Sequence, residues 1–395
     1  MKLVLVISDY GAFNNFLTEL SSTIAQDDNH TVHIICSKSK VINIADKVKF
    51  EKKNINFHYV DIPRTTSLVG EFKAASKIRS LITTINPDLI HSHFTTGTFP
   101  AVLFRKKGYT YWSTIHGLGM NSSKGFRKLV FTIVETICFM RVDRIFVVND
   151  QDFNLVNRFF SKKVLKYDCF GFGCDIDKFN PANFADSKRI ELKEKIGIQD
   201  GNIVITFTGR YVDFKGFNLV IQAFQKLTDK FPNKFKLILM GGFDPIHKTG
   251  LEEDGNKFFN TSKDIINLGF TNDVYKYLSI TDIFLFPSKK EGLPTCILES
   301  LAMGVPVITF DVRGNNDIVK NNYNGILLNP GEEVNAELEN IATSLQELSF
   351  NVDKRTEFQK NALKDRLKYS RNNFINEHLK YYSTLNNHNG NGKVH

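Results

Sequence analysis

Two acidic residues, Glu291 and Glu299, lie eight positions apart in the segment PSKKEGLPTCILESLAMGVPVITF, and both could take part in chemistry. Glu291 stands in a predicted loop after a short apolar run. Glu299 lies about one turn into a helix that we expect to begin near Pro294 or Thr295, where proline suits the first turn and threonine can cap. Such carboxylates could form a catalytic pair, bind a metal, accept hydrogen bonds from the hydroxyl groups of a ligand or be ordinary surface residues.

Two cations, Arg210 and Lys215, lie in the segment GRYVDFKGFNLVIQAF, between an apolar run and a predicted helix. Cations near a helix N-terminus favour an anionic ligand, because unpaired backbone N–H groups and the helix dipole add to their charge. A diphosphate fits such a site. Two solvated surface charges remain the alternative, because this spacing is only moderately specific.

A glycosidase pair and a metal site are the other interpretations of the two acids. Glycosidases need a carboxyl group near each face of the scissile bond, and their mechanism has no use for a neighbouring cationic phosphate site. No third carboxylate or histidine joins Glu291 and Glu299 at ligand spacing, and Asp175 and Asp177 fall in an expected linker. The sequence therefore predicts a charged leaving group and no metal.

The elements that must position these residues alternate between strands and helices. Short runs that are apolar throughout, such as KLVLVIS, DLIHSHF, IVITFTG and DIFLFPS, are separated by helical stretches. Such strands indicate parallel sheets covered on both faces, so we expect a doubly wound α/β architecture, formed twice. Ligands of open parallel sheets bind beyond the carboxyl ends of the strands, where most of the candidate residues lie.

The chain has 395 residues, which is too long for one compact core and favours two domains. We expect the linker near Gly173, where glycines and a proline interrupt the pattern. The predicted organisation is a first domain over residues 1–172, a second over 173–367, a helix over 368–386 and a disordered tail over 387–395.

Charge and composition limit the class of partner. The net charge of +9 and the isoelectric point near 9.1 favour nucleic acid, an acidic membrane surface or a phosphorylated small molecule. Nucleic acid ranks last, since the chain has neither a basic strip interleaved with aromatic residues nor an RNA-binding motif. The five cysteines form no CxxC pair, which argues against a disulfide framework or a structural zinc site.

The first apolar run is too short for a signal peptide, and no apolar window is long enough to span a membrane, so we expect a cytoplasmic protein. The segment KGFRKLVFTIVETICFMR, residues 124–141, has cations at its ends and an apolar middle. It predicts either a helix that rests on an anionic membrane or a buried core helix.

The run from Gly209 to Pro330 resembles the donor-binding domain of retaining GT-B glycosyltransferases, the nucleotide-sugar family that builds bacterial surface polysaccharides and glycolipids. GRYVDFKG resembles the phosphate-binding segment of this family, LGFTNDV its nucleobase loop, EGLPTCILE its signature of two glutamates and GCDIDKFNP its interdomain linker. The resemblance implies a GT-B fold, in which two Rossmann-like domains face each other across a cleft and the helix over 368–386 returns to the first domain.

The resemblance also implies roles for single residues. Arg210 and Lys215 would hold the diphosphate, Glu291 the hydroxyls of the donor sugar, and Glu299 those of the ribose. The further donor contacts would be Gly11, Gly209, Phe270, Gly292, Leu293, Pro294 and Thr295. Gly11 departs from the pattern, because it is the single glycine of a loop that is usually glycine-rich in this family.

Two histidines follow strands in the first half. His116, in YWSTIHGLG, precedes a glycine that would aim the imidazole into the crevice, and the family often carries a histidine at this strand end. We therefore group His116 with Arg210, Lys215 and Glu291 as catalytic candidates. His93, in DLIHSHF, is an acceptor-side candidate, with a hydrogen-bonded structural histidine as the alternative.

We expect transfer of a sugar from a nucleotide diphosphate sugar, such as a UDP-hexose or UDP-N-acetylhexosamine, to a hydroxyl of a lipid-linked or saccharide acceptor. The resemblance implies retention of configuration and a reaction that needs no metal or other cofactor. A nucleotide-sugar epimerase on the same fold and a non-catalytic nucleotide-sugar binding protein are the alternatives.

Overall fold

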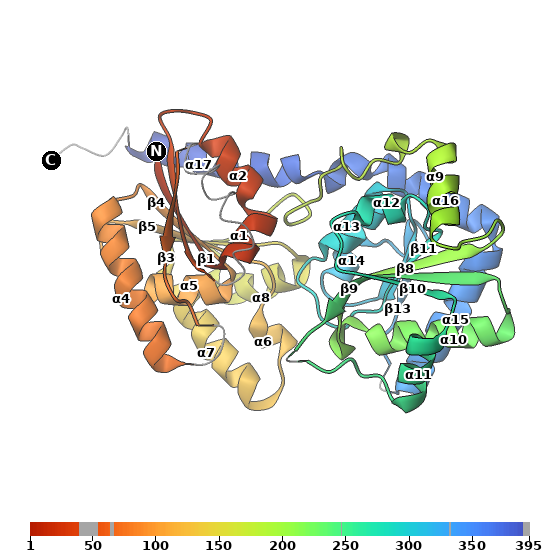
Figure 1. Cartoon of the computed structure of the whole chain (residues 1–395). Helices are drawn as coiled ribbons and strands as arrows, with labels where there is room; N and C mark the ends of the chain where they lie inside the picture. The colour runs from red at the N-terminus through yellow and green to blue at the C-terminus, as the bar shows by residue number, and fades with distance from the viewer. Residues whose placement is uncertain (39–53, 64–66, 246, 332, 390–395) are drawn as a thin grey trace. The chain divides into compact units, whose positions relative to one another are not determined.

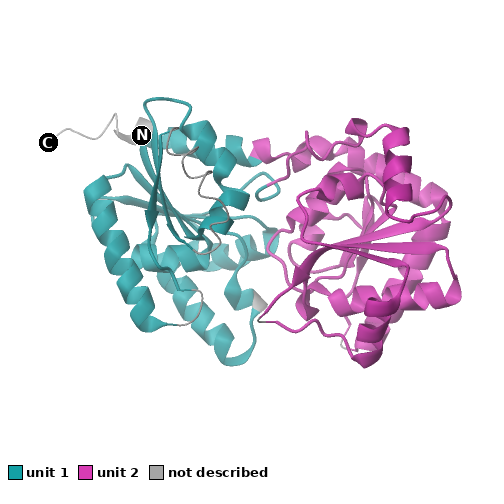
Figure 2. Ribbon diagram, in the orientation of Figure 1, with its two compact units in different colours: residues 1–172, 374–395 teal, residues 173–373 magenta. Residues whose placement is uncertain are grey.

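The computed structural model describes residues 1–38, 54–63, 67–245, 247–331 and 333–389 (Figure 1). The chain divides into two units of α/β structure, each with its own sheet (Figure 2). Unit 1 comprises Met1–Phe172 and Phe374–His395, and unit 2 comprises Gly173–Asn373.

The described part of unit 1 contains a seven-stranded parallel sheet in the order β3-β2-β1-β4-β5-β6-β7. Its strands are β1 (Lys2–Asp9), β2 (Thr31–Ser37), β3 (Ile55–Tyr59), β4 (Leu89–His93), β5 (Thr110–Ile115), β6 (Arg144–Val147) and β7 (Val164–Lys166). The described helices before Phe172 are α1 (Tyr10–Phe16), α2 (Thr18–Ile24), α4 (Leu68–Ile85), α5 (Phe94–Leu103), α6 (Gly119–Ser122), α7 (Gly125–Arg141) and α8 (Asp150–Phe160).

The described part of unit 2 contains a six-stranded parallel sheet in the order β10-β9-β8-β11-β12-β13. Its strands are β8 (Ile203–Tyr211), β9 (Phe235–Phe243), β10 (Ile265–Gly269), β11 (Ile283–Phe286), β12 (Val307–Phe310) and β13 (Gly325–Leu328). Its helices are η1 (Pro181–Asn183), α9 (Asp186–Lys195), η2 (Asp213–Lys215), α10 (Phe217–Lys230), α11 (Glu253–Thr261), α12 (Val274–Leu278), α13 (Thr295–Ala302), α14 (Asn315–Ile318), α15 (Val334–Phe350), α16 (Val352–Lys364) and η3 (Arg366–Tyr369).

Both sheets have the doubly wound parallel architecture that the apolar runs predict. The interior strand β1 buries Leu3, Val4, Leu5 and Val6 completely, as expected of a strand covered on both faces. In unit 2, Figure 1 shows α10, α11 and α15 beneath the sheet and α9, α12 and α13 above it. The carboxyl ends of the parallel strands in each unit meet at one edge, where the loops that carry the candidate residues begin.

The end of the chain differs in detail from the prediction. Helical structure begins with η3, breaks at Ser370 and continues as α17 (Arg371–Asn389), so residues 387–389 extend the helix instead of forming a tail. From Phe374 onward the chain belongs to unit 1. Residues 390–395, the rest of the predicted tail, lie outside the described residues.

Candidate functional site

A tight turn at the carboxyl end of β8 positions Lys215. The 3₁₀ turn η2 ends at Gly216, whose φ of 76° lies in the left-handed region. A Cβ atom at Gly216 would lie 2.2 Å from the carbonyl oxygen of Pro287, so only glycine allows the turn to approach the end of β11 this closely. The backbone N–H of Lys289 then donates to the carbonyl of Phe214 at 3.0 Å, which joins the two loops.

Lys215 and Glu291 contact each other directly at this junction. The Nζ atom of Lys215 lies 2.5 Å from Oε1 of Glu291, and their side chains are only 19% and 8% exposed. Ser288 Oγ lies 2.5 Å from the same carboxylate oxygen. An ammonium group has three N–H donors, so Lys215 can hold Glu291 and still donate to an anion.

Backbone contacts hold the Glu291 loop from its other side. The Nε atom of Arg313 donates to the carbonyl oxygen of Glu291 at 3.0 Å. Gly314 has a φ of 83°, and a Cβ there would lie 2.4 Å from the carbonyl oxygen of Gly292. The loop between β11 and α13, which carries Glu291, Gly292 and Leu293, is therefore held in place by the segments that follow β8 and β12.

The helix after this loop begins where the sequence predicts. Pro294 is the N-cap residue of α13 and Thr295 is its first helical residue. The expected cap by Thr295 is wrong, because its side chain lies inside the helix and no described side chain caps this N-terminus. The first turn therefore has no side-chain cap among the described residues, although the N–H of Ile297 donates to the carbonyl of Pro294 at 3.3 Å.

Arg210 lies at the same end of β8 but is more exposed than Lys215. Its side chain is 51% exposed, and Nη1 lies 2.6 Å from Oδ2 of Asp244. The guanidinium also lies over the ring of Phe214, 5.3 Å from its centroid. Sequence reasoning missed Asp244, although it follows the end of β9, the strand that pairs with β8.

Glu299 lies in α13 beside two cations that sequence reasoning also missed. Burial raises the pKa of the Glu299 carboxyl to about 7, although the charges of Arg371 and Lys178 lower it. Lys178 belongs to the segment GCDIDKFNP, which gave a sequence signal, whereas nothing in the sequence predicts that Arg371 is close. The backbone N–H of Arg371 donates to the carbonyl of Cys174 at 2.8 Å, which fixes this proximity.

Two further candidates lie at the same edge of the unit 2 sheet. Gly209 belongs to β8, and its carbonyl oxygen lies 1.8 Å from the place of a Cβ on Gly241 in β9, so the two strands approach closely only because Gly241 lacks a side chain. Phe270 follows β10 directly, and its side chain is 83% exposed. An exposed aromatic ring at this edge is available for stacking on a planar base.

His93 and His116 of unit 1 contact each other. His93 ends β4 and is fully buried, and its Nδ1 lies 3.2 Å from Nε2 of His116. His116 follows β5 and stacks on the ring of Phe172, with centroids 4.0 Å apart. Burial holds the pKa of both histidines well below 6.5, and the nearby His378 adds to the effect, so both imidazoles are neutral.

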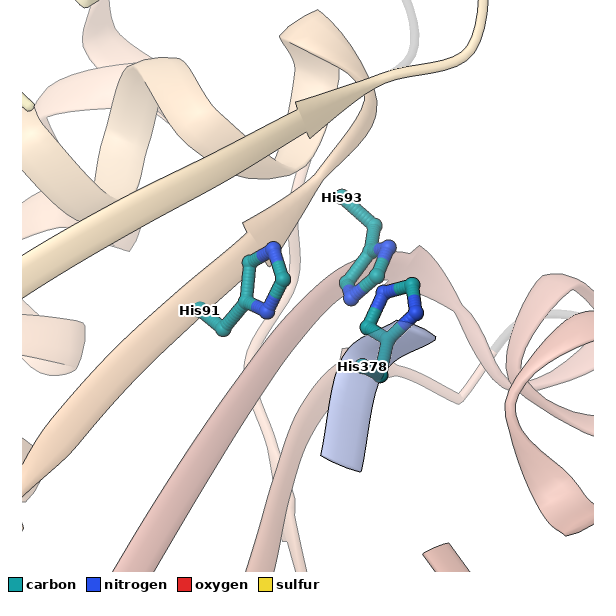
Figure 3. A group of neighbouring side chains, drawn as sticks. All are labelled: His91, His93 and His378. Atoms are coloured by element: carbon teal, nitrogen blue, oxygen red, sulfur yellow. The ribbon is translucent and has the colours of Figure 1, made fainter. Parts of the chain in front are cut away.

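His91, His93 and His378 form a buried cluster, in which one ring nitrogen of each histidine lies within 4.8 Å of the others (Figure 3). His91 Nδ1 lies 2.7 Å from the hydroxyl of Tyr382, and His378 Nε2 lies 2.9 Å from the hydroxyl of Tyr167. A metal ion would have to replace these hydrogen bonds in an apolar interior. The cluster is better explained as a hydrogen-bonded network that fastens α17 to the unit 1 sheet.

Gly11 lies in a helix and not in a loop, and its contact with the donor stays a prediction. The chain passes from β1 directly into α1, with Asp9 as the N-cap that accepts a hydrogen bond from the N–H of Ala12 at 3.0 Å. Gly11 is thus part of the first helical turn. The expectation of a loop at this position is wrong, because the Asp9 side chain starts a helix immediately after the strand.

Known families match most of the chain. A family model described as "Glycosyl transferases group 1" matches residues 188–365, and one described as "Glycosyl transferase 4-like" matches residues 4–149. The UDP-Gal:alpha-D-GlcNAc-diphosphoundecaprenol alpha-1,3-galactosyltransferase of Escherichia coli is 26% identical over 310 residues, which cover 76% of this chain and 77% of that protein. The capsular polysaccharide biosynthesis glycosyltransferase CapM of Staphylococcus aureus is 26% identical over 313 residues, which cover 77% and 78%.

A solved structure has a similar fold over nearly the whole chain. The crystal structure of Anabaena HepE in complex with UDP superposes with a TM-score of 0.74 at 16% identity and covers 97% of this chain and 100% of that one. Together with the two parallel sheets, this likeness confirms the predicted GT-B fold. The two family models, the bacterial relatives and the fold agree, and the chain belongs to the GT-B glycosyltransferases of the family 4 type.

Proposed function

We propose that the chain transfers a hexosyl or N-acetylhexosaminyl group from a UDP-sugar to a hydroxyl of a lipid-linked acceptor, with retention of configuration, in surface polysaccharide or glycolipid biosynthesis. The observation that carries this proposal is the paired Lys215 and Glu291 at the ends of β8 and β11, with Arg210 at the same strand end. The name of the Escherichia coli relative supports a UDP donor and a diphosphoundecaprenol acceptor, and Anabaena HepE has also been solved with UDP-glucose.

In this proposal the protein acts by positioning and by electrostatic stabilisation. Arg210, Lys215 and the N-terminus of α13 stabilise the charge that develops on the departing diphosphate. Glu291 accepts hydrogen bonds from sugar hydroxyls while Lys215 holds its carboxylate in place. His116 is neutral and can hydrogen-bond to the sugar, and the departing phosphate helps to deprotonate the attacking hydroxyl.

The assay that tests the proposal supplies a panel of nucleotide sugars and a lipid-linked acceptor, with and without EDTA. Because fixed cations hold the diphosphate, we expect transfer to continue in EDTA and to stop when the acceptor is omitted. Activity that disappears in EDTA and returns with manganese would contradict the cationic site. Release of nucleotide diphosphate without acceptor would favour the epimerase, and donor binding without any turnover would favour the binding protein.

We also propose that the chain contacts the inner face of the cytoplasmic membrane peripherally. The part of α7 near the cations Lys124 and Lys128 exposes Phe126 (78%) and Leu129 (55%), so α7 is not the fully buried helix that was the alternative. Exposed apolar groups beside cations suit an anionic bilayer surface. Among the described helices, none is both long and apolar enough to cross a membrane.

A vesicle assay tests this contact. Replacing both Phe126 and Leu129 with serine should weaken flotation with anionic phospholipid vesicles by about tenfold or more, because two apolar side chains no longer enter the bilayer. The matched control is Phe159→Ser on α8, where the replaced phenylalanine is also 78% exposed. Equal binding of the wild type, the double variant and the control would rule out this surface as the membrane contact.

A further inference from the structure

An apolar pocket in unit 1 lies close to the carboxyl ends of β3 and β4. It has a volume of about 460 Å³, within the range of small-molecule sites. Its walls come from the start of α4, the start of α5 and one side of α7, and from Pro63 after β3. The lining residues are Pro63, Ser67, Leu68, Glu71, Thr95, Thr96, Phe99, Phe126, Arg127, Val130, Phe131 and Val134.

The mouth of the pocket is continuous with an exposed apolar surface. Leu68 and Phe126 both line the pocket, yet their side chains are 75% and 78% exposed. Leu129 and Ile133 extend this surface along α7, with 55% and 52% exposure. Exposed apolar area of this kind marks a binding surface.

The charges near the pocket favour an occupant with an anionic head. Arg127 lines the pocket, and Lys124 and Lys128 lie beside it on the exposed start of α7. An amphiphile with a hydrocarbon chain and a phosphate head matches both features, because the chain covers apolar carbon while the head meets the cations. A free sugar would leave the apolar walls without a partner.

Glu71 is the one carboxylate among the described residues of the pocket lining. Its Oε2 atom is buried and has no hydrogen-bond partner among those residues. Two titratable groups of α7 lie near Glu71. Arg127 lines the same pocket, and Cys138 is close enough that the charge of Glu71 raises the pKa of the Cys138 thiol. Glu135 is engaged elsewhere, with Thr95 and the N–H groups of α6, and α5 offers only hydroxyl groups.

We propose that this pocket binds the part of the acceptor lipid's hydrocarbon tail that lies next to its phosphate head, and that Glu71 must be neutral when this tail is bound. This inference rests on the proposed lipid-linked acceptor. It adds which part of that lipid unit 1 binds. Contact with the lipid tail removes water from the Glu71 carboxyl. Burying an ionised carboxylate in an apolar site without a hydrogen-bond partner costs free energy, so the bound state favours the neutral form.

The binding test uses farnesyl diphosphate, a soluble amphiphile with a short isoprenoid chain. Calorimetry is done without vesicles and with saturating UDP, so that neither a bilayer nor the donor diphosphate site accounts for the signal. Val130→Trp and Thr96→Trp fill the pocket from α7 and from α5. We expect each variant to weaken farnesyl diphosphate binding by about tenfold or more, because the tryptophan occupies the space in which the isoprenoid tail would make apolar contacts.

Met140→Trp is the matched control, since Met140 lies on the same helix, is 57% exposed and does not line the pocket. This variant should bind farnesyl diphosphate with the same affinity as the wild type. The affinity for inorganic pyrophosphate should be the same in all of the proteins. Melting temperatures and UDP affinities identify variants that fail to fold. Unchanged farnesyl diphosphate binding in folded Val130→Trp and Thr96→Trp proteins overturns the inference.

The role of Glu71 is tested by Glu71→Gln, compared with the wild type at each pH. Burial raises the pKa of Glu71 to about 7. The wild type is therefore about nine-tenths ionised near pH 8 and mostly neutral near pH 6, so the variant should bind about tenfold more tightly near pH 8 and similarly near pH 6. Equal affinities of the two proteins near pH 8 contradict the assignment of Glu71.

These outcomes are separate from those of the transfer assay. If the chain is not a glycosyltransferase acting on a lipid-linked acceptor, no sugar is transferred, whatever binds in the pocket. If only the pocket assignment fails, Val130→Trp still transfers sugar to the lipid-linked acceptor with an unchanged KM.

Discussion

Replacing Lys215 with alanine should lower turnover by about two to three orders of magnitude, which is the scale of losing one preorganised group that stabilises transition-state charge. Lys215 is 19% exposed and can donate hydrogen bonds to a diphosphate from a site largely shielded from water. The affinity for the nucleotide sugar should fall less, because Arg210 and the N-terminus of α13 remain. The measurement is kcat and KM for sugar transfer under saturating acceptor.

The Lys215–Glu291 contact adds a second consequence. Without the ammonium group, the carboxylate of Glu291 keeps the Ser288 hydroxyl but loses its cation, so its orientation toward the sugar is lost as well. The double variant with Glu291→Ala should therefore lose less activity than the two single effects combined. Lys290→Ala is the control, an exposed lysine in the same loop. Turnover of Lys215→Ala within a factor of about two of the wild type would mean that the cationic site has been misplaced.

The apolar runs of the sequence were sufficient to predict both sheets. The first predicted run, KLVLVIS, lies within β1, and IVITFTG lies within β8. The observed β8 is longer by two residues, because Arg210 and Tyr211 continue to pair with β9. This extension depends on the glycines of the neighbouring strand, which allow the two backbones to approach, and a single strand pattern contains no such information.

The contact between Lys215 and Glu291 could not be predicted from the sequence. Each follows a different strand, and β9 and β10 separate those strands along the chain. The pair forms because β11 lies next to β8 in the sheet, an order that apolar periodicity does not specify. The same reason explains why Asp244, the partner of Arg210, was missed.

Solvent exposure was the other property that the sequence did not determine. The segment over residues 124–141 was compatible with a buried helix, but only Glu135, Cys138 and Phe139 of α7 are buried. Glu135 is buried among apolar residues. Because it is a charged residue type, a prediction from the sequence would place it on the exposed face of the helix. Its carboxylate is satisfied by Thr95 and by two backbone N–H groups, which come from segments distant in the sequence.

Replacing Glu299 with alanine should weaken nucleotide-sugar binding by about 10- to 100-fold, since a carboxylate that accepts two hydroxyl hydrogen bonds is removed. Turnover at saturating donor should change much less, because the ribose lies away from the reacting carbon in the proposed complex. Calorimetry gives the affinity and a transfer assay gives kcat. A large loss of kcat with unchanged affinity would contradict the assignment of Glu299 to the ribose.

The pH dependence of binding provides a sharper test of Glu299. Its pKa in the folded chain is about 7, raised by burial above the ordinary value of 4.5. Hydroxyl donors of a ligand favour the ionised carboxylate, so binding should release a proton and strengthen as the pH rises through 7. Below the pKa, the affinity should fall by about tenfold for each pH unit. The probe is the intact nucleotide sugar, because its diphosphate has no group that titrates in this range.

Glu299→Gln is the control for this profile, since it keeps the shape of the side chain and cannot ionise. Its affinity should be lower than that of the wild type near pH 8 and should not change between about pH 6 and pH 8. The pH dependence of folding stability has the opposite sign to that of ligand binding, because the pKa of Glu299 is higher in the folded chain than in the unfolded chain. The ionised carboxylate destabilises the wild type progressively from about pH 4.5 to pH 7, and Glu299→Gln should therefore raise the melting temperature near pH 8 but not near pH 4.5. An equally steep affinity profile in the glutamine variant would assign the titration to another group.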